Sequence, residues 1–142
     1  MIFSENDIEI IKKTISEAEK QTSGEIRVHI EKRCRGNVID RAAFVFKMLK
    51  MDQTAERNGV LFYLAWKDRK FAILGDTGIN DLVPPDFWDR IKDVMQDHFS
   101  KGMFVAGLSE GIEMAGDALK EFFPHQQNDV NELSDDISFG KM

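Results

Sequence analysis

The sequence predicts an α/β fold, a three-layer α/β/α sandwich with a mixed central sheet and elements in the order αβαββαα. Three observations predict it. Segments with a helical apolar period interleave with segments of strand character, which is typical of a sheet covered by helices on both faces. The connection between the first two strands is long enough for a right-handed parallel crossover. A short polar break separates the second and third strands, which indicates an antiparallel hairpin.

The first helix and the first strand have clear boundaries. The helix begins at Ser4, in a pattern close to a capping box, and ends near residues 22–24. Residues 24–31 then alternate between polar and apolar side chains, with the apolar ones on one face. This period of two predicts a half-buried strand, and it places His29 on the solvated face.

The remaining elements follow from the same signals. A stretch that is apolar throughout indicates a central strand covered on both faces. Proline and glycine residues mark the ends of the later helices. The predicted elements are a helix from Asp40 to about residue 50, strands at 60–66 and 70–74, a helix between Pro84-Pro85 and Gly102, and a helix at 104–123.

Residues 1–124 are predicted to form one α/β domain, and residues 125–142 a flexible acidic C-terminal tail. The tail is polar and acidic, and its few apolar residues are too scattered to form a core. They are Leu133, Ile137 and Phe139.

Composition and charge exclude several classes of function. The chain has 25 acidic and 19 basic residues and a net charge of −6, which argues against general nucleic-acid binding. It has no apolar stretch long enough to span a membrane and no secretory signal. Its one cysteine, Cys34, suits a reducing compartment. We therefore expect a cytoplasmic monomer with no membrane span and no nucleic-acid partner.

The predicted topology gathers polar residues at one edge of the sheet. If the first two strands are parallel, their N-terminal ends meet the C-terminal end of the third strand. Carboxylate and amide oxygens gathered in this way are ligands for Ca²⁺ or Mg²⁺. The alternative is that Arg57 pairs with Glu25 and that the nearby glycines only make a turn. The candidate metal ligands are Glu25, Glu56, Asp76 and Asp81, supported by Arg57 and Asn58.

Other kinds of site are not supported by the sequence. There is no P-loop and no G-x-G-x-x-G motif for a nucleotide. There is no G-x-S-x-G nucleophile elbow, and the three histidines have no zinc-ligand spacing.

The order and spacing of four short segments resemble the TPM-domain family, over about residues 4–123. The resemblance implies an α/β/α sandwich, divalent-metal binding, and the acid phosphatase activity attributed to some plant members. Many members have G-[YF]-G where this chain has Gly75-Asp76-Thr77-Gly78, so Asp76 is an added ligand or a loop variant. By motif match, Glu25, Arg57, Asn58 and Asp81 correspond to family positions. The segments are Thr22-Ser23-Gly24-Glu25-Ile26, Arg57-Asn58-Gly59-Val60-Leu61, Asp68-Arg69-Lys70, and Ile73-Leu74-Gly75-Asp76-Thr77-Gly78-Ile79.

Three functions remain open from the sequence. The first is a divalent-cation-binding TPM-type domain whose physiological role the sequence does not specify. The second is a metal-assisted acid phosphatase, in which Arg57 would hold the phosphate and Asp76 or Asp81 would act as base or nucleophile. The third is an adaptor that binds a protein partner through the tail.

Overall fold

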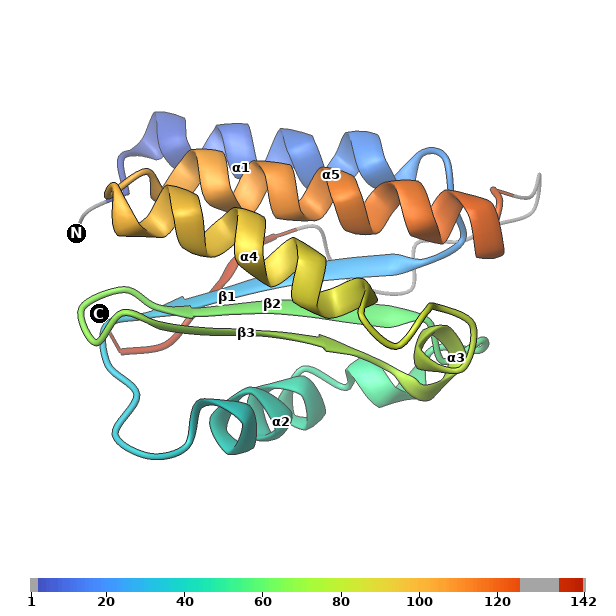
Figure 1. The fold of residues 1–142 in the computed structure, drawn as a ribbon, viewed down its shortest axis with the longest axis horizontal. Coiled ribbons are helices and arrows are strands. Elements are labelled where there is room, and N and C mark those ends of the chain that lie inside the picture. The colour runs from blue at the N-terminus through green and yellow to red at the C-terminus, as the bar shows by residue number, and fades with distance from the viewer. Residues whose placement is uncertain (1–2, 126–135, 142) are drawn as a thin grey trace.

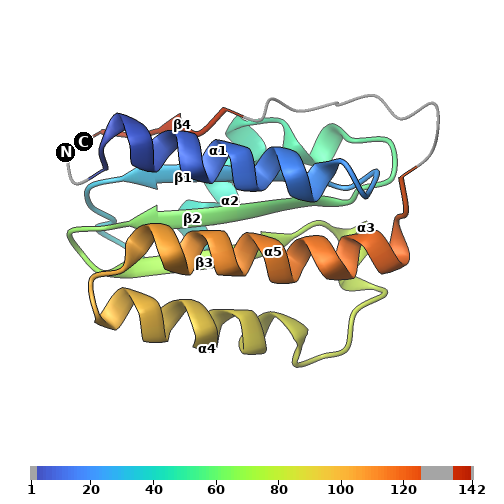
Figure 2. The same ribbon diagram turned by 90° about the horizontal axis from the view of Figure 1, so that it is seen from above.

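The computed structural model describes residues 3–125 and 136–141. A four-stranded sheet in the order β3-β2-β1-β4 lies between two helical layers (Figure 1). Helices α1, α4 and α5 cover one face, and α2 covers the other (Figures 1 and 2). The predicted three-layer sandwich is confirmed. The elements are α1 (Glu5–Glu19), β1 (Glu25–Glu31), α2 (Val38–Met48), the 3₁₀-helix η1 (Met51–Gln53), β2 (Gly59–Ala65), β3 (Lys70–Gly75), α3 (Thr77–Asn80), α4 (Phe87–Ser100), α5 (Phe104–Phe122) and β4 (Ser138–Phe139).

The sheet is mixed, as predicted. Strands β1 and β2 pair in parallel, with Glu25 opposite Gly59. Strands β2 and β3 form an antiparallel hairpin, with Val60 opposite Gly75. The start of β1, the start of β2 and the end of β3 therefore lie together at one end of the sheet. This end is the edge at which the predicted site residues gather. Helix α3, which the sequence did not predict, follows directly at this edge (Figure 1).

The core lies on both faces of the sheet. One apolar cluster fills the space beneath α1, α4 and α5, and includes Ile26, Val28 and Ile30 of β1. A smaller cluster lies beneath α2, and includes Tyr63 and Cys34. None of the helices in the described ranges has the length and apolar composition needed to cross a bilayer.

Strand β1 differs from the prediction of a half-buried strand. Its polar face is also covered, so that His29 is only 1% exposed and Glu31 only 4% exposed. Alternation was a poor guide here because the polar side chains of this face pair with one another beneath α2. The expectation that His29 is solvated is therefore wrong.

The C-terminal segment forms a strand where the sequence predicted a flexible tail. Residues Ser138 and Phe139 pair in parallel with His29 and Ile30 of β1, and Ile137 is buried. This pairing covers the free edge of β1, which would otherwise present unpaired backbone groups. Residues 126–135, which include Leu133, and residue 142 of the predicted tail lie outside the described residues.

Candidate functional site

Backbone hydrogen bonds join the three segments that the sequence predicted to converge. The Glu25 amide donates to the Asn58 carbonyl at 3.4 Å, and the Asp76 amide donates to the Gly59 carbonyl at 2.9 Å. The Gly78 amide donates to the Arg57 carbonyl at 2.8 Å. The candidate residues therefore sit on neighbouring, hydrogen-bonded segments.

Arg57 and Asp76 form a two-pronged ion pair across this edge. The Nε and Nη2 atoms of Arg57 donate to Oδ2 and Oδ1 of Asp76 at 2.7 and 2.8 Å. This hydrogen-bonded carboxylate raises the pKa of Arg57. Asp76 also caps α3, since its Oδ1 accepts from the Thr77 amide at 2.7 Å. The partner of Arg57 is thus Asp76, and not the Glu25 of the alternative interpretation.

Glu56 and Asn58 form a second polar cluster with Ser23. Oε2 of the exposed Glu56 accepts from the Ser23 hydroxyl at 3.0 Å and from Asn58 Nδ2 at 3.3 Å. Asn58 is 1% exposed. Its other side-chain atom, Oδ1, is buried and has no hydrogen-bond partner among the described residues. A buried acceptor without a donor is unusual and costs folding free energy.

A glycine allows the two clusters to approach each other. A Cβ atom on Gly78 would lie 2.2 Å from the Glu56 carbonyl oxygen and 2.5 Å from that of Arg57. Both are backbone atoms that cannot move aside locally. Residue 78 therefore has to lack a side chain for α3 to pack against residues 56–57.

The two remaining candidates lie differently. The Glu25 side chain is buried at the start of β1. Asp81 is exposed and follows α3 as its C-cap. No hydrogen bond or ion pair of the Asp81 side chain occurs within the described part of the chain.

Comparison with known proteins assigns the family. The family model of the TPM domain matches residues 1–118. The chain belongs to the TPM-domain family. It is 48% identical to the BA42 protein of the psychrophilic bacterium Bizionia argentinensis, whose NMR structure superposes with a TM-score of 0.92 over 99% of this chain and 97% of that one. No curated protein sequence matches this chain.

Two more distant solution structures share the fold of this TPM domain. The N-terminal domain of the cg2496 protein of Corynebacterium glutamicum is 16% identical, with a TM-score of 0.67 over 83% of this chain and 74% of that one. The N-terminal domain of a P. gingivalis protein is 22% identical, with a TM-score of 0.69 over 89% and 83% of the two chains.

The donor atoms gathered at this edge of the TPM domain are mainly oxygens, the ligand type of hard divalent cations. Within residues 3–125 and 136–141, no three carboxylate, imidazole or thiol groups are placed to hold a metal ion as they stand. The atoms at the edge nevertheless have suitable chemistry. The Glu56 carboxylate, the Ser23 hydroxyl and the buried Asn58 Oδ1 are all hard oxygen donors of the kind that Ca²⁺ and Mg²⁺ prefer. In chemistry, though not in the number of charged ligands, these donors are of the type that a partly hydrated ion uses.

The other two functions gain no support from the side-chain contacts. Arg57, which would hold a phosphate, directs two of its nitrogens at Asp76. Asp76, which would act as base or nucleophile, is engaged in the same pair. The adaptor hypothesis assigns partner binding to the apolar residues of the tail. Of these, Ile137 is buried against the TPM domain and is not accessible to a partner, whereas Phe139 is 41% exposed.

Sequence reasoning missed two neighbours of the site. Ser23 belongs to the segment Thr22-Ser23-Gly24-Glu25-Ile26, but its hydrogen bond to Glu56 depends on the register of β1 and β2, which the segment does not report. Asp52 of η1 acts electrostatically on Arg57, and its buried Oδ1 accepts no hydrogen bond from the described residues. No pattern around Asp52 marks it as part of the site.

Proposed function

We propose that this TPM domain binds a divalent cation, Ca²⁺ or Mg²⁺, at the sheet edge where β1 and β2 begin. The Glu56 carboxylate and Asn58 Oδ1 would be its first protein ligands. One observation carries the proposal: the buried Asn58 oxygen has no donor, and it belongs to an amide that is fixed against an exposed carboxylate.

The chemistry of these atoms favours a cation over a further hydrogen-bond donor. The Asn58 amide donates to Glu56 through Nδ2, which fixes the orientation of its oxygen. Ser23 also donates to the Glu56 carboxylate, so the carboxylate is positioned as well. A cation that contacts Asn58 Oδ1 would satisfy this buried acceptor, and it would also be attracted by the nearby charge of Glu56, which contacts Nδ2 of the same amide.

The other predicted ligands would have secondary roles. Glu25 and Asp81 lie on the two flanking segments and are candidates to complete the coordination, together with water. Asp76 would act mainly through Arg57, because both of its oxygens already accept hydrogen bonds from that residue. An ion with so few protein ligands keeps several waters, and we expect a dissociation constant on the order of 10⁻⁴–10⁻³ M.

The test is a titration with CaCl₂ and with MgCl₂, followed by backbone-amide NMR. We expect saturable shifts at residues 23–25, 56–59 and 75–81. Glu56→Gln keeps the shape of the side chain and removes its charge, and should weaken binding about tenfold or more.

Glu113→Gln is the matched control. Glu113 is an exposed residue on α5, so this variant makes the same charge change away from the edge. It should bind the ion as the wild type does. Shifts spread over the acidic surface, or an equal loss in both variants, would contradict the proposal.

A further inference from the structure

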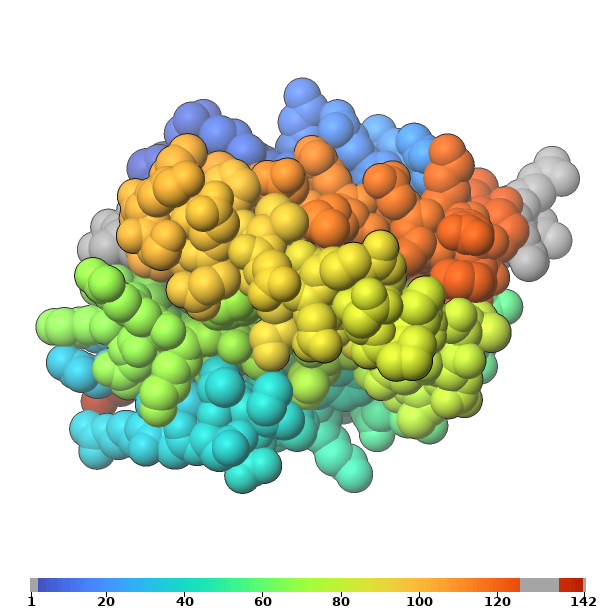
Figure 3. All heavy atoms as spheres, viewed as in Figure 1, coloured from blue at the N-terminus to red at the C-terminus, as the bar shows by residue number. Residues whose placement is uncertain are grey.

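A basic groove lies at the opposite end of the sheet, beside the C-terminal end of β1. It has a volume of about 980 Å³ and is bounded by loop residues 32–37, the start of α2 and Lys141. The loop and the β2–β3 turn project together at this end of the molecule (Figure 3). Five basic and two acidic side chains line the groove, although the whole chain carries a net charge of −6. The basic residues are Lys32, Arg33, Arg35, Arg41 and Lys141.

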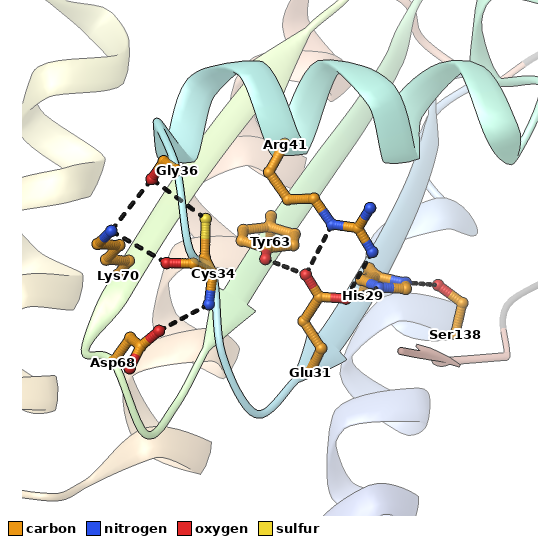
Figure 4. A network of polar contacts seen from close by, with 9 residues as sticks. All are labelled: His29, Glu31, Cys34, Gly36, Arg41, Tyr63, Asp68, Lys70 and Ser138. Atoms are coloured by element: carbon orange, nitrogen blue, oxygen red, sulfur yellow. Dashed lines mark hydrogen bonds and ion pairs between the residues drawn. The ribbon is translucent and has the colours of Figure 1, made fainter. Parts of the chain in front are cut away.

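A buried network fixes Arg41 beside this groove (Figure 4). Its Nε and Nη2 atoms donate to the two oxygens of Glu31 at 2.8 and 2.9 Å. The Tyr63 hydroxyl donates to the same carboxylate, and His29 Nε2 lies 3.2 Å from it. Burial alone would raise the pKa of Glu31, but the hydrogen bonds from Arg41, Tyr63 and His29 outweigh it and hold this pKa at about 2. Glu31 is therefore ionised in the folded protein. Its negative charge is compensated by Arg41, whose side chain it holds in place.

Loop residues 32–37 form one wall of the groove, and side chains of the β2–β3 hairpin hold this loop in place. Asp68 accepts from the Cys34 amide at 2.8 Å and from Arg33 at 3.1 Å. Lys70 donates to the carbonyls of Cys34 and Gly36 at 3.0 and 3.1 Å (Figure 4). These contacts hold the loop in place before any ligand arrives.

The C-terminal segment completes the groove. The Lys32 amide donates to the Lys141 carbonyl at 2.9 Å, and His29 Nδ1 lies 2.7 Å from the Ser138 hydroxyl. These contacts bring Lys141 to the rim, far in sequence from the other basic residues.

The charges that remain on the groove favour an anion. Glu31 is paired with Arg41, and Arg33 is paired with Asp68. Lys32, Arg35 and Lys141 make no ion pair with any residue in the described ranges. The groove also receives the N-terminal end of α2, whose dipole favours negative charge, although Asp40 in the same turn opposes it.

The groove also has an apolar wall. Phe44 is 58% exposed, and the Arg41 guanidinium lies 5.2 Å from the centre of its ring. A flat or apolar group attached to an anion could pack against this ring while the anion contacts the basic side chains.

We propose that this groove binds a small molecule that carries a phosphate group, with the phosphate held by Lys32, Arg35 and Lys141 and the body of the molecule against Phe44. Arginine and lysine side chains around a positioned guanidinium are the usual protein partners of phosphate oxygens. The proposal is independent of the cation site, because the two lie at opposite ends of β1.

The test uses amide NMR on the full chain without divalent cations. The probes are inorganic phosphate and phenylphosphonate, which has a ring and no ester bond to hydrolyse. We expect saturable shifts at residues 32–37, 40–44 and 141, and about tenfold weaker binding in the double variant Lys32→Gln/Arg35→Gln. Phe44→Ala should weaken binding of phenylphosphonate and leave that of phosphate unchanged.

The control is Lys47→Gln, an exposed basic residue in the last turn of α2. Equal weakening in Lys47→Gln and in the double variant would overturn the proposal, because it would indicate general charge attraction. Sedimentation with phosphatidylglycerol vesicles forms a separate arm. If the protein binds these vesicles and neither small probe shifts the groove residues, the occupant is a membrane surface and the proposal is wrong.

Discussion

Arg57 joins the start of β2 to the end of β3 through its ion pair with Asp76. Arg57 is 47% exposed at its side chain and Asp76 only 3%, so the arginine covers a buried carboxylate. Arg57 has a φ of 51°, in the left-handed region, which is uncommon for a residue other than glycine. The pair therefore holds the loop that contains the candidate cation ligands.

Removal of the Arg57 guanidinium, which covers the Asp76 carboxylate, should destabilise the protein. Arg57→Gln leaves the Asp76 charge buried without its partner, and we expect a measurable loss of stability, moderated because about half of the arginine side chain is exposed to solvent. Urea unfolding measures this loss. Arg90→Gln is the control, because Arg90 pairs with Asp86 on an exposed surface and its loss should cost less than about 0.5 kcal/mol. Equal effects would show that the pair carries no structural role.

The close packing of α3 against residues 56–57 should be sensitive to one methyl group. In Gly78→Ala the new Cβ would meet two backbone carbonyls, and we expect about 1–3 kcal/mol of destabilisation together with weaker cation binding. Gly36→Ala is the matched control, because nothing lies within 4 Å of its added Cβ. Unfolding curves that coincide for the two variants would contradict this packing.

Much of this edge could be predicted from the sequence, because topology decides which strand ends meet. The crossover length indicated that β1 and β2 are parallel, and the hairpin then placed Asp76 in the same region as Arg57 and Glu25. The partner of Arg57 could not be predicted, since Glu25 and Asp76 both lie on neighbouring segments. The role of Asn58 depends on which amide atom faces Glu56, and no sequence pattern reports that.

The Glu31 network should make stability depend on pH. The pKa of Glu31 is about 2 in the folded protein against an ordinary value of 4.5, so the unfolded chain takes up the proton first as pH falls. Its contribution, about 3 kcal/mol, is complete above about pH 4.5 and is lost between pH 4.5 and 2. Urea unfolding of the wild type and of Glu31→Gln should differ strongly at pH 7 and converge near pH 2. A constant difference across this range would contradict the account.

The sequence was a weaker guide to this second network. Polar residues that alternate along a strand predict a solvated face, and Glu31 and His29 fit that pattern. They are buried because Arg41, 10 residues away from Glu31 on α2, and Tyr63 on β2 satisfy them. Ser138, 109 residues from His29, adds a contact that no local pattern could indicate.

The docking of β4 should depend on Gly140. A Cβ atom there would lie 2.1 Å from Glu31 Oε1 and 2.8 Å from Glu31 Cβ, so Gly140→Ala should displace the strand. We expect faster hydrogen exchange at the Lys32 amide, which donates to Lys141, and about 1–3 kcal/mol of lost stability. Gly36→Ala serves again as the control. Unchanged protection of Lys32 in Gly140→Ala would show that β4 tolerates a side chain at this position.

The most direct test of the central claim is the effect of Ca²⁺ or Mg²⁺ on the free energy of unfolding, measured for the wild type and Glu56→Gln in parallel. An ion that binds only the folded protein should stabilise the wild type by about 2.7 kcal/mol at a concentration 100 times its dissociation constant. At the same concentration, Glu56→Gln should gain at least about 1 kcal/mol less, because its affinity is lower. No stabilisation of the wild type, or the same gain in both proteins, would contradict a cation site at Glu56 and Asn58.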